Sequence, residues 1–351
     1  MEKSFRMELA GRSLIVETGK MAKQASGAVL VRYGETVVLV TSTASKEARE
    51  GMDFFPLTVD YEEKMYAVGK MPGGFLRREG RPGNSAILNA RLIDRPIRPL
   101  FDKRCRNDIH VMATVLSVDY DNAPELCGML GASASLGISD IPWDGPIAGV
   151  RVGRVDGKFV INPTQEQLKV STLNITVAGS ETAILMVEGG AQEAPEEDVL
   201  DAIMFGHETI KELVAFQKKI IEEVGKPKRT LIFPEIPEEI KTAIYAYAER
   251  PLKEAIFNPD KLTREAHMEE VRKEAEAHFK EIYPENGSDI AECLNHLTKE
   301  IVRHMISVDK IRPDGRALDE IRPISCEVGL LPRVHGSALF TRGQTQALTI
   351  T

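Results

Sequence analysis

Residues 327–351, EVGLLPRVHGSALFTRGQTQALTIT, repeat a pattern that is already present at residues 17–42, ETGKMAKQASGAVLVRYGETVVLVTS. The shared positions, in order, are Glu17 with Glu327, Gly19 with Gly329, Lys23 with Arg333, Ala28 with Ala338, Arg32 with Arg342 and, past a one-residue gap, Gly34 with Gly343, Thr36 with Thr345 and Leu39 with Leu348. Two unrelated β-meanders would share some Gly, Val and Thr. The common order of different residue types favours an internal duplication, and a duplication decides the architecture.

The sequence between the two copies predicts three domains. Short β-branched runs separated by Gly-containing turns indicate an antiparallel meander over residues 5–42. Further strands are expected at 54–61, 109–119, 172–178 and 183–188, and helices at 84–92, 123–137 and 196–224. This mixture favours an α/β (α+β) sandwich, without a βαβ repeat, over residues 1–227. Residues 236–308 keep helical spacing of apolar residues and predict a small all-helical linker domain, and residues 309–351 predict an incomplete second copy of the first domain.

Composition limits the classes of function. The formal net charge of −8 argues against a general nucleic-acid coat, so an anionic partner must meet a local basic patch. The four cysteines form no CxxC pair and have no His at ligand spacing nearby, which predicts neither a disulfide framework nor a structural zinc site, and no residue is assigned as a metal ligand. The apolar runs are far shorter than the roughly 18 residues that span a bilayer. We expect a protein of the cytoplasm that does not contact a membrane.

The densest positive charge lies between residues 77 and 106, where nine basic residues stand against three acidic ones. Arg77, Arg78 and Arg81 belong to a glycine-flanked loop, and the adjacent Phe75 could stack on a base of a single strand. Three more arginines, at i, i+4 and i+3 spacing along a predicted helix, are Arg91, Arg95 and Arg98. Arginine pairs bidentately with phosphate, so the cluster predicts an RNA or phosphate site. The alternative is an exposed basic loop whose arginines pair with carboxylates, including Glu79 and Asp94.

The chain resembles bacterial polynucleotide phosphorylases along almost its whole length. The segments that carry the resemblance are GGFLRREGRP at 73–82, RLIDRPIRPLF at 91–101, FGHE at 205–208 and RVHGSALFTRG at 333–343. The resemblance implies two ribonuclease PH-like domains around a helical domain, in a homotrimeric ring with single-stranded RNA in a central channel. The family's Phe-Phe-Arg-Arg loop, which grips RNA, maps onto Phe75, Leu76, Arg77 and Arg78, with Leu76 in place of the second aromatic residue.

The resemblance implies a phosphate-dependent 3′-to-5′ exoribonuclease in mRNA degradation, one that releases nucleoside diphosphates and can run in reverse as an RNA polymerase. Inorganic phosphate would be the co-substrate and Mg²⁺ the cofactor. The family's phosphate-binding serines and metal-binding carboxylates are expected beyond residue 351, so the catalytic residues are unknown here. Other RNA-degradation proteins are expected as partners. Two alternatives remain: a catalytically inactive RNA-binding ring scaffold formed by this piece alone, and a structural subunit without chemistry.

Overall fold

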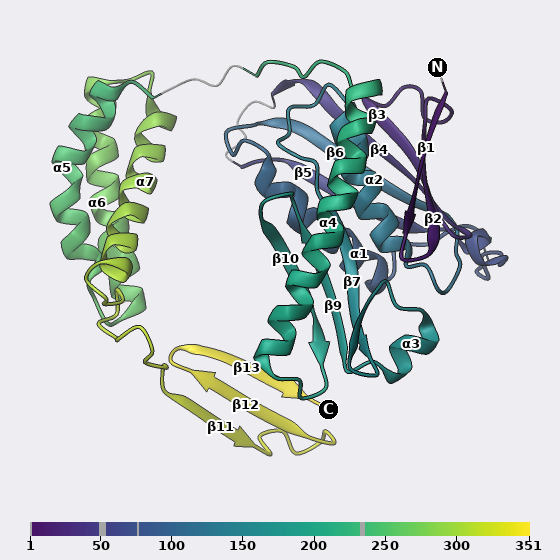
Figure 1. Ribbon diagram of the computed structural model, residues 1–351. Helices are drawn as coiled ribbons and strands as arrows, with labels where there is room; N and C mark the ends of the chain where they lie inside the picture. The colour runs from purple at the N-terminus through teal and green to yellow at the C-terminus, as the bar shows by residue number, and fades with distance from the viewer. Residues whose placement is uncertain (1, 49–53, 76, 232–235) are drawn as a thin grey trace. The chain divides into compact units, whose positions relative to one another are not determined.

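The computed structural model describes residues 2–48, 54–75, 77–231 and 236–351. The chain divides into two compact units, Met1–Phe233 and Pro234–Thr351 (Figure 1). The predicted class, α/β with a helical part and a further sheet, is confirmed. No helix of the described residues has the length and apolar character to cross a lipid bilayer.

A six-stranded sheet forms the first layer of the first unit. Its strands are β1 (Lys3–Leu9), β2 (Arg12–Thr18), β3 (Gly27–Tyr33), β4 (Thr36–Ala48), β5 (Leu57–Glu63) and β6 (Asn107–Ser117), in the order β1-β2-β3-β4-β6-β5. The strands from β1 to β4 form the predicted antiparallel meander. The last pair differs, because β5 runs parallel to β6. Helix α1 (Asn84–Ile97) provides the crossover that parallel strands need, so the sheet contains a single β5–α1–β6 unit.

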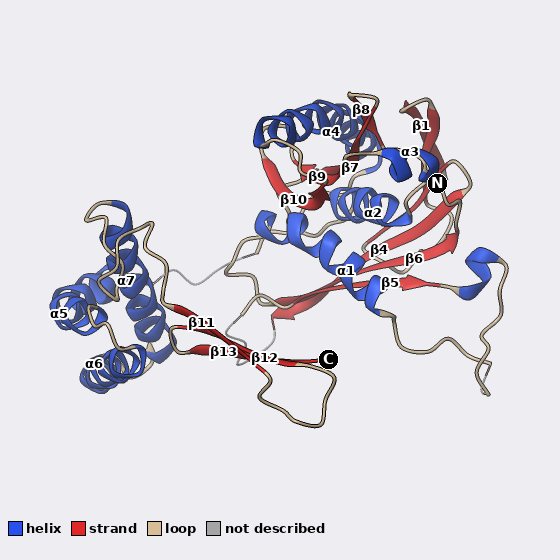
Figure 2. Ribbon diagram, turned by 90° about the horizontal axis from the view of Figure 1, so that it is seen from below, coloured by secondary structure: helices blue, strands red, loops and turns tan. Residues whose placement is uncertain are grey.

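Helix α2 (Pro124–Ile138) lies at the centre of the first unit, between two sheets (Figure 2). The second sheet has the order β10-β9-β7-β8 and comprises β7 (Ala148–Val155), β8 (Lys158–Ile161), β9 (Leu173–Gly179) and β10 (Ile184–Ala191), with the short helix α3 (Gln165–Val170) between β8 and β9. Every α2 residue from Leu126 to Ile138 is buried. Its Gly and Ala residues permit this close packing: a Cβ added at Gly131 would lie 2.4 Å from Val40 Cγ2. Helix α4 (Glu196–Val224) packs on the second sheet through β7 and β9.

The second unit contains three helices and a small sheet. The elements are α5 (Glu238–Ile256), α6 (Lys261–Ile282), α7 (Gly287–Ser307), β11 (Ile324–Val328), β12 (Ser337–Arg342) and β13 (Thr345–Ile350). The helices share one apolar core, in which Ile244, Leu252 and Ala275 are fully buried. The three strands form an antiparallel sheet in the order β11-β12-β13.

The strand registers locate the gap in the internal repeat. Each copy has a two-residue hairpin turn that begins with a positive-φ glycine, and the residues paired across the turn are Tyr33 with Thr36 and Arg342 with Thr345. Tyr33 therefore corresponds to Arg342, so the predicted match of Arg32 with Arg342 is wrong by one residue. The match of Ala28 with Ala338 is wrong for the same reason. The gap lies in the loop before β3 and β12, where a length change leaves the strand pairing intact, whereas a one-residue shift within a strand would turn each side chain to the other face.

Candidate nucleic-acid interface

The basic loop connects the edge strand β5 to helix α1. After β5 the chain forms a short 3₁₀ turn, η1 (Met65–Val68), which ends at Gly69 in the left-handed region with φ of 71°. A second turn follows, in which Arg77 N donates a hydrogen bond to Gly74 O at 2.9 Å. Arg77 itself has φ of 43°, an uncommon conformation for a residue other than glycine. The glycines around it allow the loop to extend away from the sheet (Figure 2).

The side chains at the tip of this loop face solvent. Phe75 is 101% exposed, and Arg77, Arg78 and Arg81 are exposed as well. None of the three guanidinium groups has a hydrogen bond or an ion pair to another described residue. Leu76, the position at which the resemblance loses an aromatic side chain, lies outside the described residues. The loop therefore presents unpaired cations beside a fully exposed aromatic ring, which is the combination that binds a single-stranded polyanion.

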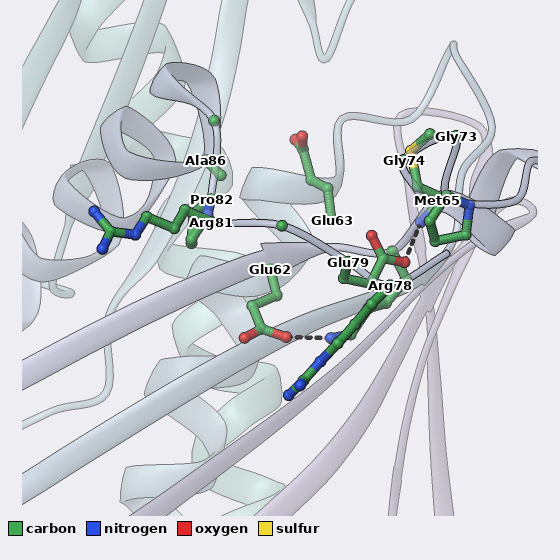
Figure 3. A pocket seen from close by; sticks show the side chains of 14 residues that line it. Glu62, Glu63, Met65, Gly73, Gly74, Arg78, Glu79, Arg81, Pro82 and Ala86 are labelled. Atoms are coloured by element: carbon green, nitrogen blue, oxygen red, sulfur yellow. Dashed lines mark hydrogen bonds and ion pairs between the residues drawn. The ribbon is translucent and has the colours of Figure 1, made fainter. Parts of the chain in front are cut away.

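A cavity of about 770 Å³ lies where the loop meets the end of β5 (Figure 3). Its lining includes Glu62, Glu63, Arg78, Glu79 and Arg81. Figure 3 shows the side chains of Arg78 and Arg81 extending in different directions from the loop. The negative charge of the cavity lining is partly neutralised. The Glu62 carboxylate accepts a hydrogen bond from the Lys64 ammonium group, and this bond raises the pKa of Lys64.

The three arginines of the α1 region have different surroundings. Arg91 is exposed and has no polar partner among the described residues. Arg95 Nη1 forms an ion pair with Glu188 of β10 at 2.5 Å. Arg98 is the most constrained: its guanidinium donates to both carboxylate oxygens of Asp94, at 2.7 and 2.9 Å, and to a backbone carbonyl of β5 at 2.9 Å. Arg95 and Arg98 therefore fit the alternative in which the arginines pair with carboxylates. Arg91 resembles the loop arginines, because it is exposed and has no polar side-chain partner among the described residues.

A second groove of about 330 Å³ runs between β5 and α1. It shares Pro82 and Ala86 with the cavity at the loop, so the two hollows adjoin. Ile87, which is 51% exposed, and Arg91 line this groove. The surface thus continues from the loop tip along α1 and offers both an apolar side chain and a free cation.

Other motif residues are structural. His207 of the 205–208 segment is buried in α4, and its Nε2 lies 3.0 Å from the carbonyl oxygen of Ser180 in the β9–β10 turn. At the edge of the basic stretch, hydrogen bonds from Arg104 lower the pKa of Asp102 to about 2. Among the described residues, no three His, Cys, Asp or Glu side chains gather closely enough to hold a metal ion.

Three family descriptions match the chain. The first domain of the 3′ exoribonuclease family matches residues 10–142, its second domain matches residues 145–209, and the RNA binding domain of polyribonucleotide nucleotidyltransferase matches residues 239–317. Among solved structures, rice (Oryza sativa) Rrp46 aligns at a TM-score of 0.47 and 14% identity, covering 63% of this chain and 94% of that one.

The first unit has two sheets around α2 and carries a loop of exposed arginines. Both domains of the 3′ exoribonuclease family match its sequence. The chain therefore belongs to the 3′ exoribonuclease family. Its sequence is similar to the polyribonucleotide nucleotidyltransferases of Heliobacterium modesticaldum, at 60% identity over 346 residues, and of Syntrophomonas wolfei, at 58% over 349 residues. These alignments cover 99% of this chain and 49% and 50% of the two relatives. The chain therefore spans about half the length of the curated relatives that it matches.

Proposed function

We propose that this chain is the RNA-holding part of a phosphate-dependent 3′-to-5′ exoribonuclease of the polyribonucleotide nucleotidyltransferase type. The observation that carries the proposal is the set of solvent-facing cations around the fully exposed Phe75, which have no partner among the described residues and lie on a loop that opens into a cavity. Arg77, Arg78, Arg81 and Arg91 would bind phosphates, and Phe75 would stack on a base. Arg95 and Arg98, which already have carboxylate partners, would shape the surface and add positive potential. Stacking and phosphate contacts predict weak sequence preference.

The proposed reaction exchanges one phosphate linkage for another. Inorganic phosphate attacks the phosphorus of the 3′-terminal phosphodiester, a P–O bond forms, and the bond to the 3′ oxygen of the preceding nucleotide breaks. The products are a nucleoside diphosphate and an RNA shortened by one nucleotide, and the reverse reaction extends RNA. Mg²⁺ would neutralise charge on the transferring group. We propose, from the resemblance to polynucleotide phosphorylases alone, that the metal and phosphate ligands lie outside these 351 residues.

We also propose the assembly that surrounds this chemistry. Residues 1–227 would be one ribonuclease PH-like domain, residues 236–308 a helical domain and residues 309–351 the start of the second ribonuclease PH-like domain, in a homotrimeric ring through which RNA passes. Other RNA-degradation proteins would associate with the ring. The four cysteines are free thiols, three of them buried, which suits the reducing cytoplasm where we place the protein.

Two assays on poly(A) test the proposal. The 351-residue chain should bind a labelled oligoadenylate with an affinity that falls steeply with salt concentration. The whole protein should release ADP from poly(A) only when inorganic phosphate and Mg²⁺ are both present. Failure of the whole protein to release ADP would overturn the proposed reaction. ADP release by the whole protein but not by the 351-residue chain would identify that chain alone as an RNA-binding scaffold.

A further inference from the structure

Glu79 has an unexpected partner for a carboxylate in the basic loop. It lies between Arg78 and Arg81, yet it pairs with no arginine of the described chain. Instead, its Oε1 accepts a hydrogen bond from the backbone N–H of Met65 at 2.9 Å, across 14 residues (Figure 3). Glu79 is half-buried, while its neighbours Arg78 and Gly80 are exposed.

The donor of this bond belongs to an anchored element. The Met65 N–H starts the 3₁₀ turn η1, and the preceding residue, Lys64, provides no side-chain cap. The turn is closed at its other end, where Lys70 N donates to Met65 O at 3.0 Å. It is also attached to the sheet, because Val118 N, just after β6, donates to Ala67 O at 3.1 Å. Glu79 therefore ties the returning arm of the loop to a turn that the sheet holds in place.

The hydrogen bond of Glu79 and its negative charge should affect RNA binding in opposite directions. A carboxylate among arginines lowers the positive potential that attracts phosphate, so electrostatics alone would favour an uncharged residue at this position. A hydrogen bond that closes the loop limits the positions open to Arg77 and Arg78, and therefore lowers the entropy that RNA binding must remove. The two effects can be separated because glutamine removes the charge but keeps an acceptor oxygen.

We propose that Glu79 is a positioning residue, whose carboxylate closes the loop from Met65 to Glu79 and holds its arginines ready for RNA; this rests on the function proposed above. Glu79→Gln should bind oligoadenylate at least as tightly as the parent chain. Glu79→Ala removes the same charge and also the acceptor, and should bind about fivefold more weakly than Glu79→Gln, the factor expected for one hydrogen bond. A purely electrostatic role predicts that the two variants bind equally well.

Glu63 offers the matched control. It lines the same cavity, it is exposed, and its side chain has no hydrogen-bond partner among the described residues. Because Glu63 closes no loop, Glu63→Gln and Glu63→Ala should bind RNA equally well. A difference between them as large as that between the Glu79 variants would show that the comparison reports side-chain size, and would overturn the proposal.

A second measurement does not depend on RNA. Trypsin cleaves after arginine, and cleavage in a loop follows its local opening. Glu79→Ala should be cut after Arg77 or Arg78 about fivefold faster than Glu79→Gln, with the same melting temperature. Equal cleavage rates would overturn the role of Glu79. Absence of oligoadenylate binding by the parent chain would instead overturn the proposed function, and the cleavage rates would still decide whether Glu79 closes the loop.

Discussion

Replacing Arg77 and Arg78 together by alanine tests the proposed RNA contact most directly. Both side chains are exposed and make no polar contact with another described residue, so their removal breaks no polar interaction within the described part of the chain. Alanine also keeps the Cβ atom at Arg77, so the positive φ of 43° stays equally unfavourable. The free energy of unfolding should therefore change by less than about 0.5 kcal/mol, as for other surface substitutions.

The expected loss appears in RNA binding. Each phosphate neutralised on a single strand contributes about 0.7 to the slope of log K against log salt concentration, so the double variant should lose about 1.4 of that slope. Two lost contacts at an exposed site, at about 0.5–1.5 kcal/mol each, should weaken binding by about 1–3 kcal/mol in total, which is about 5- to 150-fold. Fluorescence anisotropy with a labelled 20-nucleotide oligoadenylate, repeated from about 50 to 300 mM salt, measures both quantities.

A matched variant separates the loop from general electrostatics. Lys20 and Lys23 are exposed cations of the same unit without described partners, so Lys20→Ala with Lys23→Ala removes the same charge elsewhere. This control should keep nearly the full salt slope. Equal losses in the two double variants would refute the assignment of the loop as the contact. A fall of several degrees in the melting temperature of the arginine variant would show that these side chains are structural.

Four further substitutions test the site and the fold. Arg91→Ala should weaken oligoadenylate binding without a change in stability, whereas Arg98→Ala should lower the free energy of unfolding by about 1.5–3 kcal/mol, because it removes several charge-assisted hydrogen bonds; denaturant titration compares the two. The Arg229 guanidinium holds the pKa of Asp140 below its ordinary value of 3.8, so the folded state binds fewer protons there and loses this stabilisation as pH falls through the folded-state pKa. The stability deficit of Arg229→Ala should therefore be largest near pH 7 and fall in acid to the part contributed by the pH-independent bond from Arg229 Nη1 to the Ser45 carbonyl oxygen; a constant deficit across an acid titration would contradict the ion pair. Gly131→Ala should lower stability by about 1–3 kcal/mol, because its Cβ would overlap a β4 side chain; an unchanged melting temperature would show that α2 can shift away from the sheet.

The sequence alone predicted the features that depend on local pattern. Apolar spacing indicated the long helix, which the structure places at Glu196–Val224, and the helices between 236 and 308. The repeated turn chemistry indicated a second meander at the end of the chain, which is present as β11 to β13. The glycines around Arg77 and Arg78 indicated an exposed loop, because such residues favour turns over packed structure. Each of these signals depends on residues that are close in the sequence, so it does not depend on how distant segments fold.

The tertiary structure decided which of the basic side chains remain free. Arg95 and Arg98 looked equivalent to Arg91 along the helix, but Arg95 meets Glu188, 93 residues away, and Arg98 is held between its own helix and β5. Tertiary structure also decided the parallel pairing of β5 with β6 and the hydrogen bond from the Met65 N–H to the Glu79 carboxylate. Residue type and spacing state what a side chain can bind. Which partner it finds depends on segments that only folding brings together.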